Sequence, residues 1–377
     1  MGVELKAGKR SASPFRFDNV GSFLRPEKLK EARASFAVGD ISADELKRVE
    51  DECIIDLIGK QKDVGLQVIT DGEFRRSWWH LDFMWGLNGV SKETVGKGYV
   101  FHDEETRPET ARLTGRISGE NHPFVDHFTF IQQYAEEGVI ARQTLPAPAQ
   151  FLAELQRPEN ISATEEFYTD INVLVKDIAK AYQTVIQDLY AAGCRSLQLD
   201  DCTWGMIVDP NYWNARQDTE TVEGIGELYL SVNNLSIENA PEDLTVTTHV
   251  CRGNYHSTWA SSGGYDPIAN ILFEKENVSA YYLEYDTDRA GDFAPLSHVG
   301  EEKSVVLGLF SSKTGELEDK ETIKTRIKEA AQYVDLDRLC ISPQCGFAST
   351  EEGNILTEEQ QWEKLRLIKE VADEVWN

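Results

Sequence analysis

The sequence predicts an α/β fold of the (β/α)8 TIM-barrel class, built as a single domain from residues 1–377. Eight short β-like runs recur along the chain, and most are followed by a stretch with helical periodicity. The length suits one such barrel with insertions. No GxGxxG motif follows the first run, which disfavours an open doubly wound sheet that binds a dinucleotide.

The predicted strands are rich in β-branched and aromatic residues and end at turn-forming residues. They cover residues 17–23, 66–74, 141–148, 194–201, 244–251, 280–286, 304–312 and 339–346. The amphipathic stretches predicted as helices cover residues 42–62, 163–191, 218–238, 264–274, 318–334 and 357–374. The first of these helices begins at a potential N-cap, Ser42, and Gly65 closes the turn after it.

Residues 87–140 interrupt this alternation. The segment shows no clean helical periodicity and is rich in Gly, Thr, His and charged residues. We therefore predict a β-hairpin or lid inserted after the second strand. No low-complexity tract and no shift in composition indicates a second domain.

The composition limits the partners of the protein. The net charge of −27 argues against nucleic-acid or anionic-membrane binding, because both need clustered Lys and Arg. The sequence has no apolar run of about 18 residues and no signal-peptide pattern. Its six cysteines are too sparse for a disulfide scaffold. We predict a cytoplasmic monomer or homodimer that acts on small molecules.

Side chains that bind metals lie at the ends of three later predicted strands. His249 and Cys251 are two residues apart, so on a strand they point to the same side. Such a pair alone is more typical of strand-end packing. However, Glu284 and Cys345 end two further strands, and the carboxyl ends of barrel strands converge on one rim. One imidazole, two thiolates and one carboxylate form a tetrahedral set that suits Zn²⁺.

The charge of this ligand set indicates what a bound zinc would do. Two thiolates and one carboxylate around Zn²⁺ leave a net charge of about −1, which makes a poor Lewis acid for activating water. Such a site is better suited to holding an incoming thiol as a nucleophilic thiolate. The set therefore points toward alkylation of sulfur. The remaining cysteines are predicted as structural at 53, 194 and 340, while Cys202 at the rim has no predicted role.

Ordered motifs run along nearly the whole chain: "FDNVGSFLRP", "TDGEFRRSWWH", "LQLDD", "HVCRGNYHSTW", "LEYD", "VLGLFSSKTGELE" and "LCISPQCGFASTEEGN". Through them the sequence resembles the catalytic barrel of cobalamin-independent methionine synthases, and most closely their short single-barrel bacterial relatives. The resemblance implies zinc-dependent methylation of the homocysteine thiol to give methionine, with 5-methyltetrahydrofolate polyglutamate as the donor. It places the zinc on His249, Cys251, Glu284 and Cys345.

The resemblance also implies a homocysteine site. In it, Gly21 and Ser22 bind the amino acid through their backbone, and Glu73 and Asp200 face its amine. Two carboxylates at a rim attract an ammonium group on physical grounds alone. Two alternatives remain open, since "DGE" can be ordinary turn chemistry and "LDD" can cap a helix. The capping role fits Asp201 better than Asp200.

Two features depart from the family pattern. The chain has one barrel, whereas the full-length enzymes have two, and the first helps to bind folate. The family histidine that protonates the departing folate nitrogen is also missing, and Phe310 and Ser311 stand near its position. Because an amine leaves poorly unless it is protonated, we consider His256 as a substitute acid, with His80 as a second candidate. Otherwise the donor needs no acid, as with a sulfonium compound or a methylcorrinoid protein.

Other side chains near the predicted rim have two interpretations each. The aromatic stretch 74–85 and Trp204 can stack on a pterin or pack between helix and sheet. Arg75 and Arg76 can bind a substrate carboxylate or form ion pairs with the acidic protein, and Lys313 has the same two interpretations.

Two rival functions remain open. Alkyl transfer to a different zinc-bound thiol, such as coenzyme M attacking an epoxide, involves a sulfonate, whereas Glu73 and Asp200 favour an amino acid. A barrel that merely holds zinc is the non-catalytic alternative. Structural zinc sites usually group their ligands within a short segment, whereas these are spread over about 97 positions.

Overall fold

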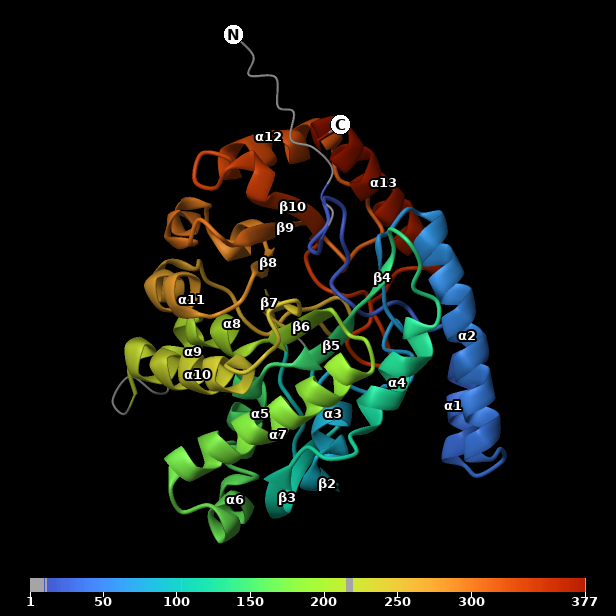
Figure 1. The fold of residues 1–377 in the computed structure, drawn as a ribbon, viewed down its shortest axis with the longest axis vertical. Coiled ribbons are helices and arrows are strands. Elements are labelled where there is room, and N and C mark those ends of the chain that lie inside the picture. Colours follow the sequence, from blue (N-terminus) through green and yellow to red (C-terminus); the bar gives the residue numbers. More distant parts are fainter. Residues whose placement is uncertain (1–9, 11, 103, 215–219, 377) are drawn as a thin grey trace.

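The computed structural model describes residues 10–376 except 11, 103 and 215–219, and it has an α/β fold. Its centre is a parallel sheet of six strands in the order β5-β6-β7-β8-β9-β10 (Figure 1). These strands are β5 (Gln143–Pro146), β6 (Ser196–Asp201), β7 (Thr245–Val250), β8 (Ala280–Glu284), β9 (Ser304–Phe310) and β10 (Leu339–Pro343). Nearly every position in them is buried, as expected for a parallel sheet covered by helices.

A second, two-stranded parallel pair continues beside β5. It consists of β1 (Val68–Ile69) and β4 (Ile140–Ala141). Only Arg142 separates β4 from β5, and its N–H donates to the carbonyl of Ile69 at 3.0 Å. Seven of the eight predicted strand runs therefore contain paired strands, although β1 is much shorter than predicted.

The predicted first strand at residues 17–23 is wrong as a regular strand. Only Phe17 forms a bridge, to Ile341 of β10, and Phe23 donates its N–H to the carbonyl of Gly72 at 3.1 Å. Between these two points, side chains satisfy the backbone instead of a neighbouring strand. The segment contacts both β10 and the residues after β1, yet no continuous ladder closes the strands into a ring within the described part of the chain.

The helices lie outside the central sheet (Figure 1), and the six predicted helical stretches all contain helix. The helices are α1 (Glu27–Ala37), α2 (Ala43–Asp63), α3 (Leu81–Gly86), α4 (Pro123–Gln132), α5 (Pro148–Leu155), α6 (Ile161–Phe167), α7 (Ile171–Ala191), α8 (Thr203–Ile207), α9 (Pro210–Asn214), α10 (Val222–Ile237), α11 (Ala269–Lys275), α12 (Lys320–Ala330) and α13 (Glu358–Trp376). Short 3-10 turns lie at Asp266–Ile268, Asp288–Ala290, Ala294–His298 and Leu336–Arg338. Ser42 caps α2 in a capping box with Glu45, as its position predicted.

Segment 87–140 contains the expected hairpin, formed by β2 (Asn88–Thr94) and β3 (Glu109–Ser118). The absence of a helix there was a wrong prediction, because α4 follows the hairpin. A proline at its first turn and the ring of His122, which accepts the N–H of Phe124 at 3.2 Å, start this helix. At ten residues, α4 is too short for its periodicity to stand out from the surrounding loop sequence.

Between β2 and β3 lies a segment that we call the strap, residues 98–106, of which 103 is outside the described residues. The strap folds back on itself through a bridge between Val100 and Glu105. It then crosses to the loop after β7, where His102 donates its N–H to the carbonyl of Trp259 at 2.9 Å. The hairpin insertion thus reaches the edge of the sheet at which the predicted metal ligands lie.

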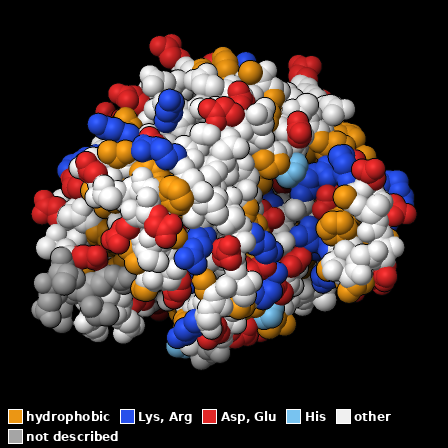
Figure 2. Space-filling model, turned by 90° about the horizontal axis from the view of Figure 1, so that it is seen from below, with side chains coloured by type: hydrophobic (Ala, Val, Ile, Leu, Met, Phe, Trp, Pro, Cys, Tyr) orange, Lys and Arg blue, Asp and Glu red, His pale blue; other side chains and the backbone are white. Residues whose placement is uncertain are grey.

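The surface carries both signs of charge. Basic and acidic side chains are interspersed over the face in Figure 2, and neither forms a broad field there. None of the helices in the described part of the chain is long and apolar enough to cross a membrane.

Candidate active site and metal centre

The four predicted metal ligands come together at the carboxyl ends of the strands. One ligand atom from each of His249, Cys251, Glu284 and Cys345 lies within 4.8 Å of the others, and all four side chains are buried. His249 is the next-to-last residue of β7, and Glu284 is the last residue of β8. Cys251 and Cys345 lie just after β7 and β10. Adjacent parallel strands in register place these ends side by side.

The ring of His249 is oriented for a metal. Its Nδ1 lies 3.2 Å from the carbonyl oxygen of Tyr282, so a hydrogen on Nδ1 is donated there and Nε2 carries the lone pair. That Nε2 is buried and has no hydrogen-bond partner among the described residues. Burial lowers the pKa of His249, but the neighbouring Cys345 and Glu284 outweigh it and raise the pKa. A buried ring nitrogen whose lone pair meets no donor suits a metal ligand.

The thiols of the two cysteines in the cluster do not ionise readily unless a cation is present. The sulfur atoms of Cys251 and Cys345 lie 3.7 Å apart. Hydrogen bonding to Cys202, followed by burial, raises the pKa of Cys251 well above its ordinary value. Hydrogen bonding to Cys251 and burial do the same for the pKa of Cys345. Both thiols must lose their protons to bind a metal, so a bound cation would supply the missing stabilisation.

Glu284 is held in its charged form. Its Oε1 accepts the N–H of Arg252 at 2.9 Å, and its Oε2 pairs with Arg289 at 3.2 Å. Burial alone would raise the pKa of Glu284, but the cations Lys313, Arg289 and Arg252 together hold it below its ordinary value. The structure thus supplies a buried carboxylate that is already ionised and oriented.

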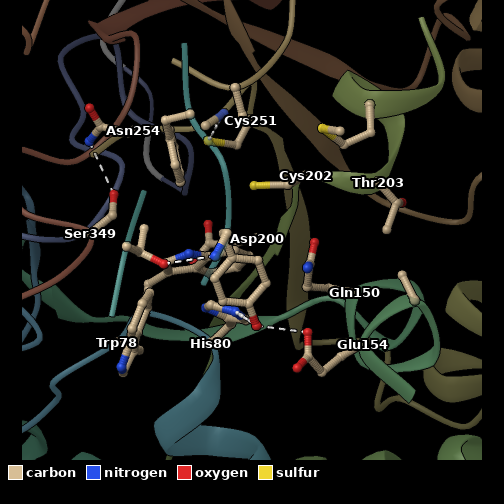
Figure 3. Close-up of a pocket in the computed structure, with 18 of the residues that line it drawn as sticks. Trp78, His80, Gln150, Glu154, Asp200, Cys202, Thr203, Cys251, Asn254 and Ser349 are labelled. Atoms are coloured by element: carbon tan, nitrogen blue, oxygen red, sulfur yellow. Dashed lines mark hydrogen bonds between the residues drawn. The ribbon is translucent and has the colours of Figure 1, made fainter. Parts of the chain in front are cut away.

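The cluster opens into the main cavity of the molecule, which has a volume of about 570 Å³ (Figure 3). The lining includes all four residues predicted for homocysteine: Gly21, Ser22, Glu73 and Asp200. Gly21 leaves room for the carboxyl group of Glu73, because a Cβ there would lie 3.1 Å from Oε1 of Glu73 and displace it slightly. His249, Cys251 and Cys345 line the same cavity.

Glu73 and Asp200 form a buried pair of carboxyl groups. Burial raises the pKa of Glu73, and burial together with Glu73 raises the pKa of Asp200 well above its ordinary value. Oε2 of Glu73 is buried without a hydrogen-bond partner, whereas Asp200 accepts a hydrogen bond from Gln198 at 2.8 Å. Two close carboxyl groups with an unused acceptor suit an ammonium ligand.

The two alternative interpretations, "DGE" as a turn and "LDD" as a helix cap, also hold for parts of these segments. The N–H of Glu73 is accepted by Asp71 at 2.8 Å, which is turn chemistry, and Glu73 adopts φ +64°. Asp201 accepts the N–H of Thr203 at 2.8 Å and a hydrogen bond from Asn233. The turn and the cap therefore orient their segments, while the side chains of Glu73 and Asp200 reach the cavity.

The two candidate acids have different surroundings. His256 pairs through Nδ1 with Glu104 at 2.8 Å and stacks on Tyr255, and it is outside the set of residues that line the cavity. His80 lines the cavity, with Nε2 3.2 Å from the hydroxyl of Tyr99. Burial lowers the pKa of His80 to about 3, so its ring is neutral near pH 7.

The other side chains with two interpretations are also placed. Arg75 pairs with Glu50 and Asp51 on α2 rather than entering the cavity. Arg76 is buried beneath the site, where it donates to the carbonyl of Thr144 at 2.9 Å and lies 3.6 Å from Glu73. Lys313 is buried and donates to Asn254, a cavity residue, at 3.1 Å. Trp204 is fully buried, whereas Trp78 and Trp79 line the cavity.

Several lining residues could not be found from the sequence pattern. They come from the strap, from α5 and from the segment around α8 and α10: Tyr99, Gln150, Glu154, Cys202, Met206 and Tyr229. The hydroxyl of Tyr99 donates to Glu154 at 2.7 Å, which connects the strap to α5 across the cavity. Only the position of Cys202 directly after "LDD" gave a signal.

The fold and this site fit the catalytic domain of the cobalamin-independent methionine synthase family. Residues 17–374 match the family model described as the catalytic domain of cobalamin-independent synthase, and the chain belongs to this family. It is 43% identical to the uncharacterized protein YxjG of Bacillus subtilis, over 99% of this chain and 98% of that one.

More distant relatives carry named activities. The methionine synthase of Saccharolobus solfataricus is 21% identical over 87% of this chain and 86% of its own. The 5-methyltetrahydropteroyltriglutamate–homocysteine methyltransferase of Bacillus mycoides is 23% identical over 88% of this chain, which spans only 40% of that enzyme.

Two solved structures share the fold. A candidate vitamin-B12-independent methionine synthase from Listeria monocytogenes superposes with a TM-score of 0.77 at 37% identity, covering 98% of this chain and 100% of that one. A B12-independent methionine synthase from Shewanella sp. W3-18-1, in complex with selenomethionine, superposes with a TM-score of 0.70 at 19% identity, covering 96% and 97% of the two chains.

Proposed function

We propose that the protein is a zinc-dependent methyltransferase that methylates the thiol of homocysteine to give methionine, with 5-methyltetrahydrofolate as the methyl donor. The observation that carries this proposal is one cavity lined both by three of the four clustered metal-binding side chains and by the carboxyl pair of Glu73 and Asp200. A thiol and an ammonium group on one small molecule match these two features.

His249, Cys251, Glu284 and Cys345 would hold the zinc. The orphaned Nε2 of His249 and the two adjacent thiols are the features of this chain that fit the ion. Bound zinc would keep the acceptor sulfur deprotonated and nucleophilic near neutral pH. The backbone N–H of Arg252 and the side chain of Arg289 hold the two oxygens of Glu284, so this ligand is oriented in advance.

The chain itself orients homocysteine. Glu73 and Asp200 bind its ammonium group, and the absence of a side chain at Gly21 leaves the carboxyl group of Glu73 in place. Anchoring the amine while the sulfur is held a fixed distance away leaves the thiolate one accessible direction for attack on the methyl group. Positioning of this kind replaces an improbable encounter of two reactants with a defined geometry.

His256 is proposed to supply the proton that the departing folate nitrogen needs. Its ring bonds to Glu104 of the strap and lies outside the cavity lining, so this role requires the ring to move toward the cavity. Donors that leave without protonation, such as a sulfonium compound or a methylcorrinoid protein, are the alternative. The substrate of the coenzyme M type is disfavoured by the two carboxyl groups, which would repel a sulfonate.

We further interpret the strands as a (β/α)8 barrel with residues 87–140 inserted after the second strand. The bridge of Phe17 to β10 and the bond from Phe23 to Gly72 support placement of the first segment between β10 and β1. Location in the cytoplasm and a monomeric or homodimeric state remain part of the same proposal.

Zinc-edge X-ray absorption tests the proposal directly. Zinc-loaded protein is measured with and without homocysteine, and formation of methionine is then followed with 5-methyltetrahydrofolate, S-methylmethionine or methylcobalamin as donor. We expect one additional sulfur neighbour on adding homocysteine, and methionine from the folate. Cys345→Ser should lose the zinc, whereas Cys53→Ser on α2 should keep it. An unchanged zinc environment would instead indicate a barrel that stores metal.

A further inference from the structure

We propose that Arg289 is a positioning residue that fixes the metal-facing carboxylate of Glu284 and, through Trp259, makes metal retention depend on the seating of the strap. This inference rests on the proposed metal centre and adds a link between that centre and a segment distant in sequence. It concerns three contacts in series: Glu284 to Arg289, Arg289 to Trp259, and Trp259 to His102.

The first contact restrains the ligand. Nη2 of Arg289 lies 3.2 Å from Oε2 of Glu284 and also 3.2 Å from Oδ1 of Asp286. The other oxygen of Glu284 is fixed by the backbone N–H of Arg252, which does not depend on any side chain. Rotation of the carboxylate is therefore controlled at Oε2, by Arg289. Groups that orient metal ligands in this way typically contribute about 10–100-fold to metal affinity.

The second contact restrains Arg289. Its side chain is nearly buried, and the guanidinium lies 5.0 Å from the ring centroid of Trp259. A planar guanidinium on an aromatic face is favourable and fixes the orientation of the group. Trp259 belongs to the loop that follows β7 and contains Cys251. Its contact with Arg289 therefore joins this loop to the loop after β8.

The third contact joins Trp259 to the strap. The rings of Trp259 and His102 stack with their centroids 5.1 Å apart and an interplanar angle of 10°. The N–H of His102 also donates to the carbonyl of Trp259 at 2.9 Å. His102 is exposed and lies in a segment whose neighbours Tyr99 and Phe101 line the cavity. Movement of the strap therefore alters the face on which Arg289 rests.

The strap has a reason to move. It is bonded to both walls of the cavity, to α5 through Tyr99 and Glu154 and to the β7 loop through His102. Substrates that enter beneath such a segment must displace it or use the opening it leaves. Through the three contacts, displacement of the strap changes how firmly Arg289 holds the carboxylate of Glu284. A measured interaction energy between the two ends of this series tests the coupling.

A double-mutant cycle on zinc release tests the inference. The full chain is loaded with zinc, and release to an excess of a chromogenic chelator is timed for wild type, Arg289→Met, His102→Ala and the double variant. Arg289→Met should speed release about 10–100-fold. His102→Ala should speed it about threefold in the wild-type background, given the usual strength of an aromatic pair. In the Arg289→Met background it should change nothing further.

Glu104→Gln provides a matched control in the same strap. Glu104 bonds to His256 and is not in the series to Glu284, so its effect should be the same in both backgrounds. Arg289→Lys keeps the charge but loses the fork, so its release rate should lie between those of wild type and Arg289→Met. If Arg289→Met fails to fold, the single variants Arg289→Lys and Trp259→Leu serve in its place.

Two results overturn the inference. One is zinc release from Arg289→Met and Arg289→Lys at the wild-type rate; the other is the same effect of His102→Ala in both backgrounds. Either result leaves the proposed function intact, because wild-type protein would still hold zinc. Wild-type protein that never retains zinc under reducing conditions refutes the metal centre itself, and the inference with it.

Discussion

Cys251 and Cys345 hold their sulfur atoms 3.7 Å apart although 94 positions separate them in the chain. Of the other residues in the cluster, only His249 lies near either cysteine in sequence. The two residues follow β7 and β10, which belong to one parallel sheet and end at the same edge, with β8 and β9 between them. The predictions below follow from this arrangement.

Zinc affinity should rise steeply with pH. The pKa values of Cys251 and Cys345 are raised well above the ordinary thiol value in the metal-free protein, so both are protonated near neutrality. Each thiol releases a proton on binding, and the apparent affinity should increase by about 100-fold per pH unit while both pKa values lie above the pH. Competition with a chelator of known pH dependence between pH 6 and 8 measures this. A slope near zero would mean that the thiols do not bind the metal.

Neutralising the carboxyl pair should impair recognition of the amine. Glu73→Gln and Asp200→Asn should each reduce kcat/KM for homocysteine by about 10–100-fold, because a charge-assisted hydrogen bond is lost. The control is the analogue 4-mercaptobutyrate, which lacks the amine. Wild type should strongly prefer homocysteine, whereas the variants should lose most of this preference. Equal losses for both substrates would point to misfolding of the site.

A methyl group at Gly21 should disturb the same pair without unfolding the protein. The added Cβ would lie 3.1 Å from Oε1 of Glu73, so the carboxyl group must shift by a few tenths of an ångström. Gly21→Ala should raise KM for homocysteine while the melting temperature changes little. Gly59→Ala is the matched change on α2, where nothing lies within 4 Å. It should stabilise the fold by about 0.5–1 kcal/mol and leave KM unaltered.

The role of His256 separates two classes of methyl donor. If it protonates the folate nitrogen, His256→Asn should lower kcat with 5-methyltetrahydrofolate by about 10²–10⁴-fold. The same variant should leave transfer from a sulfonium donor unchanged, since a thioether leaves without a proton. Single-turnover rates with both donors give the comparison. Equal rates for wild type and variant with the folate would exclude His256 as the acid.

The buried pair of Arg142 and Asp18 should matter for stability rather than chemistry. Their atoms lie 2.9 Å apart, both side chains are fully buried, and Arg142 also bonds to the hydroxyl of Tyr282 at 2.7 Å. Arg142→Met leaves an unpaired buried carboxylate, and we expect a loss of about 3–5 kcal/mol in the free energy of unfolding. Urea unfolding of the apo protein measures it. Zinc content per folded chain should remain that of the wild type.

The sequence was most informative where a local pattern determines the structure. Alternation of strands and helices predicted β5 to β10, and the ends of β7 and β8 predicted where His249 and Glu284 would lie. Ser42 was predicted as an N-cap because it directly precedes the helical pattern, and the structure adds that it caps α2 in a capping box with Glu45. Ligand positions followed from the topology, since parallel strands must end at the same edge.

Contacts between loops could not be predicted in this way. Arg289, Trp259 and His102 meet across three connections that have no periodicity, and nothing in "DTDRAGD" distinguishes Arg289 from a surface arginine. The strand predicted at residues 17–23 was wrong for a related reason. Its apolar residues resemble a strand, yet side chains such as that of Asp18 satisfy its backbone in place of a ladder.

The wide spacing of the ligands also constrains how the holoenzyme matures. A motif with neighbouring cysteines can capture its ion while the nascent chain is still short, and the ion then nucleates folding. Here Cys345 is synthesised only after every strand through β10, so the complete ligand set exists only once most of the molecule has been made. Under the proposed function, metal loading would therefore be a late, post-assembly event, and cells starved of zinc would accumulate a folded precursor.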